Sequence, residues 1–291
     1  AVIRRLKVAL QTGFNEVQTR FLANGNCTVV LSGNTLLVDQ LVRVIFDIAT
    51  DRVYPVAIRS TSEQLSVVAV GGYGRKELAP YSDIDLMLLH PYKQTPYIEQ
   101  VVEFILYMLW DLGLKVGHST RSCDDCIRLS KRDVSIQTSL LDARYIWGDQ
   151  APFNEFLYRY QAEVVKGRGP QFVEAKMAER DIRHDRIGDT RYVLEPNIKE
   201  GKGGLRDLQT LYWLTKFLYG VSNVSELIPL VRSKAKKTTS LTSDLPETCV
   251  IMNIGASELY KRWPIEKFVS LAEKIHVEYG LVSLFVGGPS E

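Results

Sequence analysis

The chain has 291 residues, of which 45% are apolar and 24% are charged. These fractions are typical of a folded globular protein, and they exclude a collagen-like chain, a disulfide-rich miniprotein and a mostly disordered chain. Lysine plus arginine (36) nearly balances aspartate plus glutamate (34), so the chain has no global field that would attract nucleic acid or anionic lipid. We therefore expect no nucleic-acid partner and no membrane partner, and any nucleotide site is expected to be local.

Apolar run length and cysteine content bear on the cellular compartment. The longest strongly apolar run, Phe104 to Trp110, is far shorter than the ~20 residues of a membrane-spanning helix, and no signal peptide is visible. Cys123 and Cys126 form a single CxxC, and no second ligand pair follows at the spacing of a structural zinc site. These features favour a cytoplasmic protein with ordinary thiols.

Hydrophobic periodicity places the expected elements of the first 220 residues. The near-continuous apolar run 65–70 is typical of a strand that is buried on both faces, and Gly71 and Gly72 end it. The remaining elements that we expect are helices over 4–22, 36–48 and 97–112, strands over 84–89 and 114–120, a helix or a strand within 136–147, helical structure over 152–187, and a helix around 208–218.

A basic, polar stretch around 228–244 has the composition of a linker. After it the pattern predicts a strand at 249–254, a helix at 265–279 and a strand at 282–286, which together form one βαβ unit. The domain boundaries that we expect are an N-terminal helical region over 1–64, a catalytic core over 65–150, a helical extension over 151–227, the linker over 228–244, and a partial Rossmann-like fragment over 245–291.

The chemistry is expected around Asp83 and Asp85. Residues two apart at the start of a strand place both side chains on one face, where two carboxylates repel each other unless a cation lies between them. Oxygen ligands of this kind suit Mg²⁺, which takes the rest of its shell from water and substrate phosphates. Backbone amides at Gly71 and Gly72 can approach a phosphate closely because these residues lack a β-carbon. The combination indicates phosphoryl or nucleotidyl transfer. The spacing fits neither a P-loop nor a dinucleotide-binding fingerprint.

The segment 67–89 resembles the signature of the polymerase-β-type nucleotidyltransferase superfamily, in which a Gly-Gly turn is followed by D-x-D. It is more similar still to the N-terminal domain of the bacterial PII uridylyltransferase/uridylyl-removing enzymes. Three further stretches carry that resemblance: 109–121, 139–149 and 194–210. The resemblance implies an α+β fold, in which a polymerase-β-like nucleotidyltransferase domain has flanking helices and is followed by the short Rossmann-like fragment.

The resemblance also implies roles for individual residues. Asp83 and Asp85 would bind Mg²⁺, while Gly71, Gly72 and Ser82 would hold the β- and γ-phosphates of UTP. A tyrosine of a PII-type signalling protein would attack the α-phosphorus, and pyrophosphate would leave. Arg75 is a candidate for contacting the triphosphate, with a solvated turn as the alternative.

The superfamily usually has a third carboxylate on a neighbouring strand, but the strand 114–120 carries none. We choose Asp142 as the third catalytic carboxylate, with a surface aspartate or helix cap as an equally open alternative.

Other motifs indicate alternative functions or structural roles. The tail resembles part of the ADP-heptose:lipopolysaccharide heptosyltransferases, which would give Lys261 and Glu291 donor-binding roles. A glycosyltransferase fragment and a non-catalytic nucleotide-binding module are therefore the alternative functions. His184-Asp185 lacks the further ligands of an HD phosphohydrolase, and His118 is expected to be a core histidine. The loop 199–206 resembles a phosphate- or interface-contacting loop.

Overall fold

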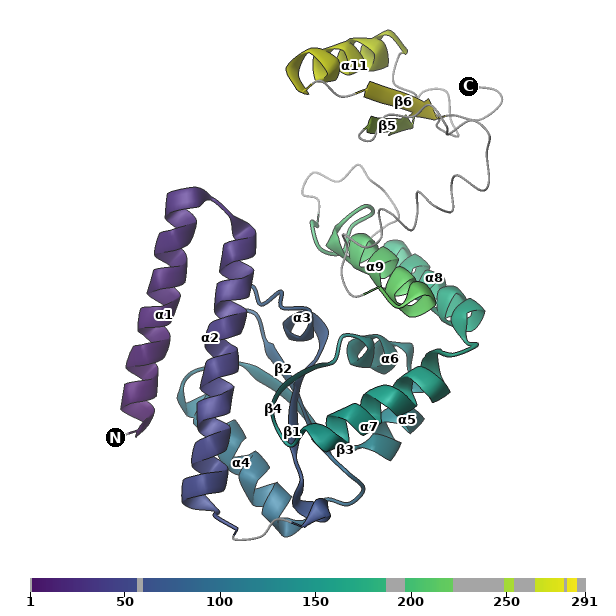
Figure 1. Cartoon of the computed structure of the whole chain (residues 1–291). Helices are drawn as coiled ribbons and strands as arrows, with labels where there is room; N and C mark the ends of the chain where they lie inside the picture. Colours follow the sequence, from purple (N-terminus) through teal and green to yellow (C-terminus); the bar gives the residue numbers. More distant parts are fainter. Residues whose placement is uncertain are drawn as a thin grey trace. The chain divides into compact units, whose positions relative to one another are not determined.

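Four strands form the sheet that carries the predicted site in the computed structural model (Figure 1). The structure describes residues 2–56, 60–186, 197–221, 249–253, 265–279 and 282–286. The strands are β1 (Ser66–Ala69), β2 (Ile84–His90), β3 (Val116–Ser122) and β4 (Arg144–Gly148), and their order in the sheet is β3-β2-β1-β4. β1 runs antiparallel to β2 and β4, whereas β2 and β3 are parallel.

This arrangement brings the end of β1 beside the start of β2. The amide of Val70 donates a hydrogen bond to the carbonyl of Asp85 at 3.1 Å, so the glycines after β1 lie next to the aspartates that open β2. The strands predicted at 65–70 and 84–89 are confirmed, and the third strand begins two residues later than expected. The sheet is mixed, in agreement with an α+β protein.

One face of the sheet is covered by α2 (Cys27–Ile48) and α4 (Pro96–Asp111), and α1 (Val2–Asn24) packs against α2 (Figure 1). The core on this face includes Val42, Ile45, Leu86, Leu88 and Ile105, which are almost fully buried. Two short helical turns, Ala49–Val53 and Thr61–Glu63, lead from α2 towards β1.

The expected start of the second helix at residue 36 is wrong, since α2 begins at Cys27. The side chain of Asn26 caps it by accepting a hydrogen bond from the amide of Thr28. Asn34 and Thr35 are buried on the inner face, and Asn34 Nδ2 donates to the carbonyl of Leu78 at 3.2 Å. These polar residues interrupt the apolar period, so the sequence pattern missed the first part of the helix.

The described residues include one helix, Cys27–Val53, that is long and apolar enough to cross a membrane by length and composition. Several of its apolar residues, among them Val38, Leu41 and Phe46, are buried in the core, whereas Leu36, Val44 and Val53 are exposed. A buried core helix passes the same test, so this feature is weak evidence for a membrane span.

The opposite face of the sheet is covered by a second set of helices, which packs around Val68, Met87 and Leu89. These helices are α5 (Cys123–Ser130), α6 (Val134–Leu141), α7 (Gln150–Tyr160) with the turn Gln161–Val165, α8 (Gly169–Arg186) and α9 (Leu205–Tyr219). The segment 136–147 holds both a helix end and a strand, α6 and β4. The predicted helical stretch 152–187 is divided near Gly167, whose φ of +75° is left-handed.

α5 was not expected from the sequence, and it contains the CxxC. Cys123 and Cys126 are buried free thiols in the core of this face, where Cys126 Sγ lies 3.5 Å from Met87 Sδ. Burial raises the pKa of each thiol to about 12. These two cysteines are therefore packing residues with little thiolate character.

His118 does not lie in the core as expected. β3 is an edge strand, the side chain of His118 is exposed, and its ring meets that of Trp110 edge-on at 5.9 Å. The expectation was wrong because the apolar neighbours of His118 in the sequence do not indicate which strand lies at the edge.

The chain divides into two compact units, 1–222 and 223–291. In the second unit, β5 (Cys249–Asn253) and β6 (Val282–Val286) are parallel, and α11 (Ile265–Tyr279) lies between them in the sequence. This matches the predicted βαβ order. The linker 228–244, Lys261 and Glu291 lie outside the described residues.

Candidate active site

The turn after β1 depends on glycine at its first position. Gly71 has a left-handed φ of +57°, and a β-carbon there would lie 3.3 Å from Asp85 Oδ2. Gly71 and Gly72 open the short helix α3 (Gly71–Gly74), whose first hydrogen bond runs from the amide of Gly74 to the carbonyl of Val70. The amides of Gly71 and Gly72 therefore have no acceptor within the helix, as the predicted phosphate-binding role requires.

The carboxylate of Asp85 lies between two positions that lack a β-carbon. Gly117 is its partner across the parallel pair β2–β3, and a β-carbon there would lie only 2.8 Å from Asp85 Oδ1. With Gly71 on the other side, the glycines leave room for the carboxylate at the start of β2. Any larger side chain at position 117 would compete with Asp85 for the same space.

Asp83 directly precedes β2 and is exposed, whereas Asp85 is partly buried. Burial, together with the negative charge of Asp83, raises the pKa of Asp85. A cation between the two carboxylates would relieve both effects, because it compensates the lost hydration and the mutual repulsion. The two side chains thus suit a hard divalent cation that completes its shell with water and substrate oxygens.

Arg75 and Ser82 differ in how firmly they are held. Ser82 is exposed, and its hydroxyl lies 3.4 Å from the carbonyl of Asp83. The side chain of Arg75 is only 7% exposed, and it donates to Glu77 Oε2 at 2.8 Å and to Asp142 Oδ2 at 2.7 Å. Arg75 is therefore not the solvated turn residue of the alternative interpretation.

Asp142 follows α6 directly, and its side chain is completely buried. Besides Arg75, Trp213 Nε1 donates to Oδ2 at 2.8 Å and Lys216 Nζ lies 3.2 Å from Oδ1. Both oxygens are thus directed to donors on the protein. The surface position that was one alternative for Asp142 is excluded.

A second network, which the sequence interpretation missed, holds the turn from the other side. Arg144 on β4 forms a bidentate pair with Asp39 on α2, at 2.8 and 3.1 Å. The same guanidinium donates to the carbonyls of Tyr73 and Gly74, and the Tyr73 hydroxyl donates to Asp39 at 2.7 Å. Burial and the charge of Asp39 raise the pKa of Tyr73, which keeps this donor protonated. The sequence signal that could have revealed this network is Arg144 itself, a charged residue at the start of the short apolar segment 144–148.

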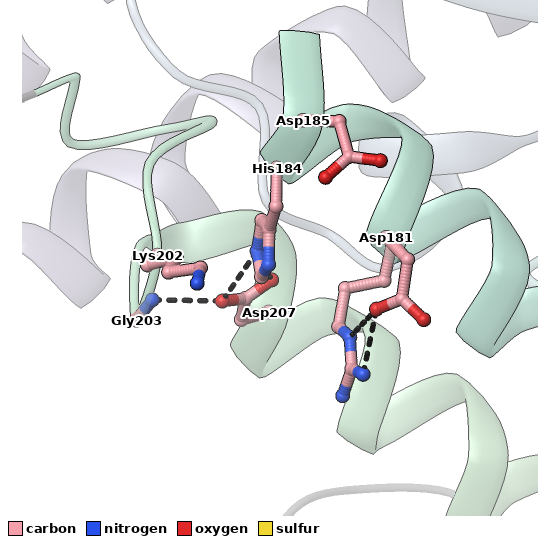
Figure 2. A pocket seen from close by; sticks show the side chains of 7 residues that line it. Asp181, His184, Asp185, Lys202, Gly203 and Asp207 are labelled. Atoms are coloured by element: carbon pink, nitrogen blue, oxygen red, sulfur yellow. Dashed lines mark hydrogen bonds and ion pairs between the residues drawn. The ribbon is translucent and has the colours of Figure 1, made fainter. Parts of the chain in front are cut away.

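The HD dipeptide lies in a separate concavity of about 620 Å³ between α8 and the loop before α9 (Figure 2). His184 on α8 and Asp207 on α9 point towards each other, and His184 Nε2 lies 3.0 Å from Asp207 Oδ1 (Figure 2). The lining residues are Arg180, Asp181, His184, Asp185, Lys202, Gly203 and Asp207, so the predicted aspartates and the glycine turn do not line it.

The loop 199–206 lies partly at this concavity, through Lys202 and Gly203. In the part of the chain that the structure describes, no group of three or more His, Cys, Asp or Glu side chains is placed to hold a metal ion. His184 thus pairs with Asp207 on another helix. Among the described residues, the HD dipeptide lacks the further ligands that a metal site would need.

Comparison with known proteins assigns two segments of the chain. Residues 57–141, which include the glycine turn and both aspartates of the D-x-D, match the nucleotidyltransferase domain. Residues 171–244, which include α9 and most of α8, match the GlnD PII-uridylyltransferase family. Neither family match extends beyond residue 244, so the resemblance of the tail to a heptosyltransferase receives no support from them.

The similar curated proteins are named bifunctional uridylyltransferase/uridylyl-removing enzyme. The protein from Rhodospirillum rubrum is 55% identical over 226 residues, which is 77% of this chain and 24% of the relative. The protein from Azospirillum brasilense is 54% identical over 228 residues, which is 78% of this chain and 24% of the relative. The chain thus spans about a quarter of the length of the curated relatives it matches.

A solved structure titled "Crystal structure of the toxin-antitoxin with AMP-PNP" is 16% identical, covering 43% of this chain and 84% of that chain, with a TM-score of 0.23. This TM-score is too low to indicate a shared fold.

Proposed function

We propose that the chain catalyses Mg²⁺-dependent nucleotidyl transfer, moving UMP from UTP to a tyrosine of a PII-type signalling protein with release of pyrophosphate. The observation that carries this proposal is the placement of Asp85 between Gly71 and Gly117, beside Asp83 and the glycine turn. The match of residues 57–141 to a nucleotidyltransferase domain supports the reaction class. The relatives' name supports the uridylyl group and, with the GlnD PII-uridylyltransferase match, the acceptor.

Each group of residues would have a separate task. Asp83 and Asp85 would hold the metal, which when bound neutralises charge on the triphosphate and favours nucleophilic attack at phosphorus. The amides of Gly71 and Gly72 would bind phosphate oxygens, Ser82 would add a hydroxyl at the exposed side, and Arg75 would contribute a guanidinium held in one orientation. The acceptor oxygen forms a bond to the α-phosphorus as the bond to the pyrophosphate oxygen breaks, and the phenolic proton is released.

The test is transfer of radiolabelled UMP from UTP to a purified PII protein in the presence of Mg²⁺. We expect label on the PII protein with the wild-type chain, and a loss of at least ~100-fold in kcat for Asp83→Asn and Asp85→Asn. Glu103→Gln, an exposed acid on the outer side of α4, is the matched control and should retain full activity. Absence of label with the folded wild-type chain, or full activity of both aspartate variants, would overturn the proposal.

A further inference from the structure

The buried carboxylate of Asp142 joins the glycine turn to the helices that follow the nucleotidyltransferase segment. Arg75 comes from the end of α3, whereas Trp213 and Lys216 come from α9, and all three donate to this one side chain. A buried carboxylate is costly without such donors, so its two oxygens are committed to them. The carboxylate is therefore poorly suited to act as a third metal ligand.

The guanidinium of Arg75 is fixed on several sides. Glu77 binds Nε and Asp142 binds Nη1, while Nη2 lies 3.8 Å from the position of a β-carbon on Gly72. The planar group thus lies against the turn whose amides would bind phosphate. An arginine that is held in one orientation loses less conformational freedom when it binds a phosphate than a mobile one.

Trp213 extends this connection to α8. Its ring has the guanidinium of Arg75 at 5.5 Å and the ammonium of Lys176 at 4.6 Å from the ring centre. Lys176 is buried on α8 and pairs with Glu179 at 2.8 Å. The two helices that match the uridylyltransferase family therefore contact, through Trp213 and Asp142, the arginine at the glycine turn.

The backbone around Asp142 is also fitted to the turn. A β-carbon on Gly74 would lie 2.1 Å from the carbonyl oxygen of Asp142, so the turn and this segment are in direct contact. Two residues further on, Arg144 binds the carbonyls of the same turn. The segment 142–144 thus holds the turn through both its backbone and its side chains.

From these contacts we infer that Asp142 is a positioning residue, which holds Arg75 in place for the triphosphate of a nucleoside triphosphate and makes α8 and α9 part of the nucleotide site. The inference rests on the proposed function, because it assumes that the glycine turn binds the triphosphate. It replaces the catalytic role that the sequence suggested for Asp142. Loss of the ion pair between Asp142 and Arg75 should weaken nucleotide binding and leave the Mg²⁺ requirement unchanged.

The experiment compares Asp142→Asn, Lys216→Met and Arg75→Gln in the full chain with the exposed control Lys93→Met. We would measure the Kd of UTP with Mg²⁺ by equilibrium titration, kcat and KM for transfer to a PII protein, and the Mg²⁺ dependence. We expect the Kd and KM for UTP to rise about tenfold in the three variants, with kcat within about threefold of wild type. The double variant Asp142→Asn/Arg75→Gln should bind UTP no more weakly than Arg75→Gln alone, because both substitutions remove the same interaction between Asp142 and Arg75.

Lys216→Met is included because we expect this variant to stay folded. The Lys216 side chain is 22% exposed, and without it Asp142 still accepts hydrogen bonds from Arg75 and Trp213. Unchanged UTP binding in Lys216→Met and in folded Asp142→Asn would overturn the inference. A loss of kcat with an altered Mg²⁺ requirement in Asp142→Asn would do the same and would identify a metal ligand. If the wild-type chain itself binds no UTP, the proposed function fails together with the inference. If the wild-type chain binds UTP and the variants bind it equally tightly, the inference alone fails.

Discussion

Asp85 on β2 and Gly117 on β3 are opposite each other in the parallel pair, and a β-carbon at position 117 would lie 2.8 Å from Asp85 Oδ1. The proposed metal site therefore depends on a residue that carries no functional group. The φ angle of Gly117 lies outside the left-handed region, so its backbone conformation is compatible with a residue that has a β-carbon. Among the residues that the structure describes, the carboxylate of Asp85 is the only group within 4 Å of a β-carbon at this position.

This relationship predicts the effect of Gly117→Ala. The added methyl group should displace the Asp85 carboxylate, so transfer activity should fall by about tenfold or more and the Mg²⁺ concentration for half-maximal activity should rise. Steady-state kinetics over a range of Mg²⁺ concentrations measures both. Ser119→Ala, on the same face of β3 two residues further on, is the control and should behave as wild type. An unchanged Mg²⁺ requirement in Gly117→Ala would contradict the assignment of Asp85 as a ligand.

The raised pKa of Asp85 predicts a pH dependence of stability in the metal-free chain. The native state holds this proton more tightly than the unfolded state, whose pKa is near 3.8. Stability contributed by this group is therefore complete at low pH and is lost as pH rises from about 3.8 through the raised native pKa. Asp85→Asn should abolish that loss, so the variant should be more stable than wild type at neutral pH.

Urea denaturation in a chelator, repeated from about pH 4 to about pH 7, measures this difference. The advantage of Asp85→Asn should grow with pH, and added Mg²⁺ should stabilise wild type more than the variant. A metal-free Asp85→Asn chain that is less stable than wild type at pH 7 would contradict the argument.

Gly74→Ala should destabilise the fold. Its β-carbon would lie 2.1 Å from the carbonyl oxygen of Asp142 and 3.0 Å from that of Ala69, and neither backbone group can move without shifting a strand or the turn. We expect a loss of at least ~2 kcal/mol in the free energy of unfolding. Gly72→Ala provides the comparison for stability, since its β-carbon would meet its nearest neighbours at an ordinary 3.8 Å. Equal stability of the two variants would show that the turn and the 142–144 segment are not in close contact.

The cysteines predict a labelling pattern. Cys27 is exposed, whereas Cys123 and Cys126 are buried and their pKa is raised to about 12, so little thiolate forms at pH 8. A maleimide reagent at pH 8 should modify Cys27 within minutes and leave Cys123 and Cys126 unmodified until the chain is unfolded. Peptide mass spectrometry follows these three cysteines separately from Cys249, the fourth cysteine of the chain. Rapid labelling of Cys123 or Cys126 in the native chain would show that α5 does not pack as described.

The sequence predicted strands at the positions of β1, β2 and β3 and the succession of the glycine turn and the D-x-D motif, because these depend on local patterns. It did not distinguish a helix from a strand within 136–147, where α6 ends and β4 begins. A run of buried β-branched and aliphatic residues identifies a central strand from its neighbours along the chain. The position of the βαβ unit rests on the same kind of local information, whereas the expected fold class came from the resemblance of the segment 67–89 to a known family. The expectations for the start of α2 and for His118 were wrong because they depended on which neighbours each residue meets in space.

The sequence alone determined that two carboxylates follow a glycine turn, since two-residue spacing and the lack of a β-carbon are properties of the chain itself. Only the tertiary structure decided what surrounds them: Gly117 opposite Asp85, Arg144 against the turn, and Asp142 enclosed by Arg75, Trp213 and Lys216. These partners lie up to 74 residues apart in sequence, as Lys216 and Asp142 do. Their contacts are set by strand pairing and helix packing, and no local spacing specifies such long-range neighbours.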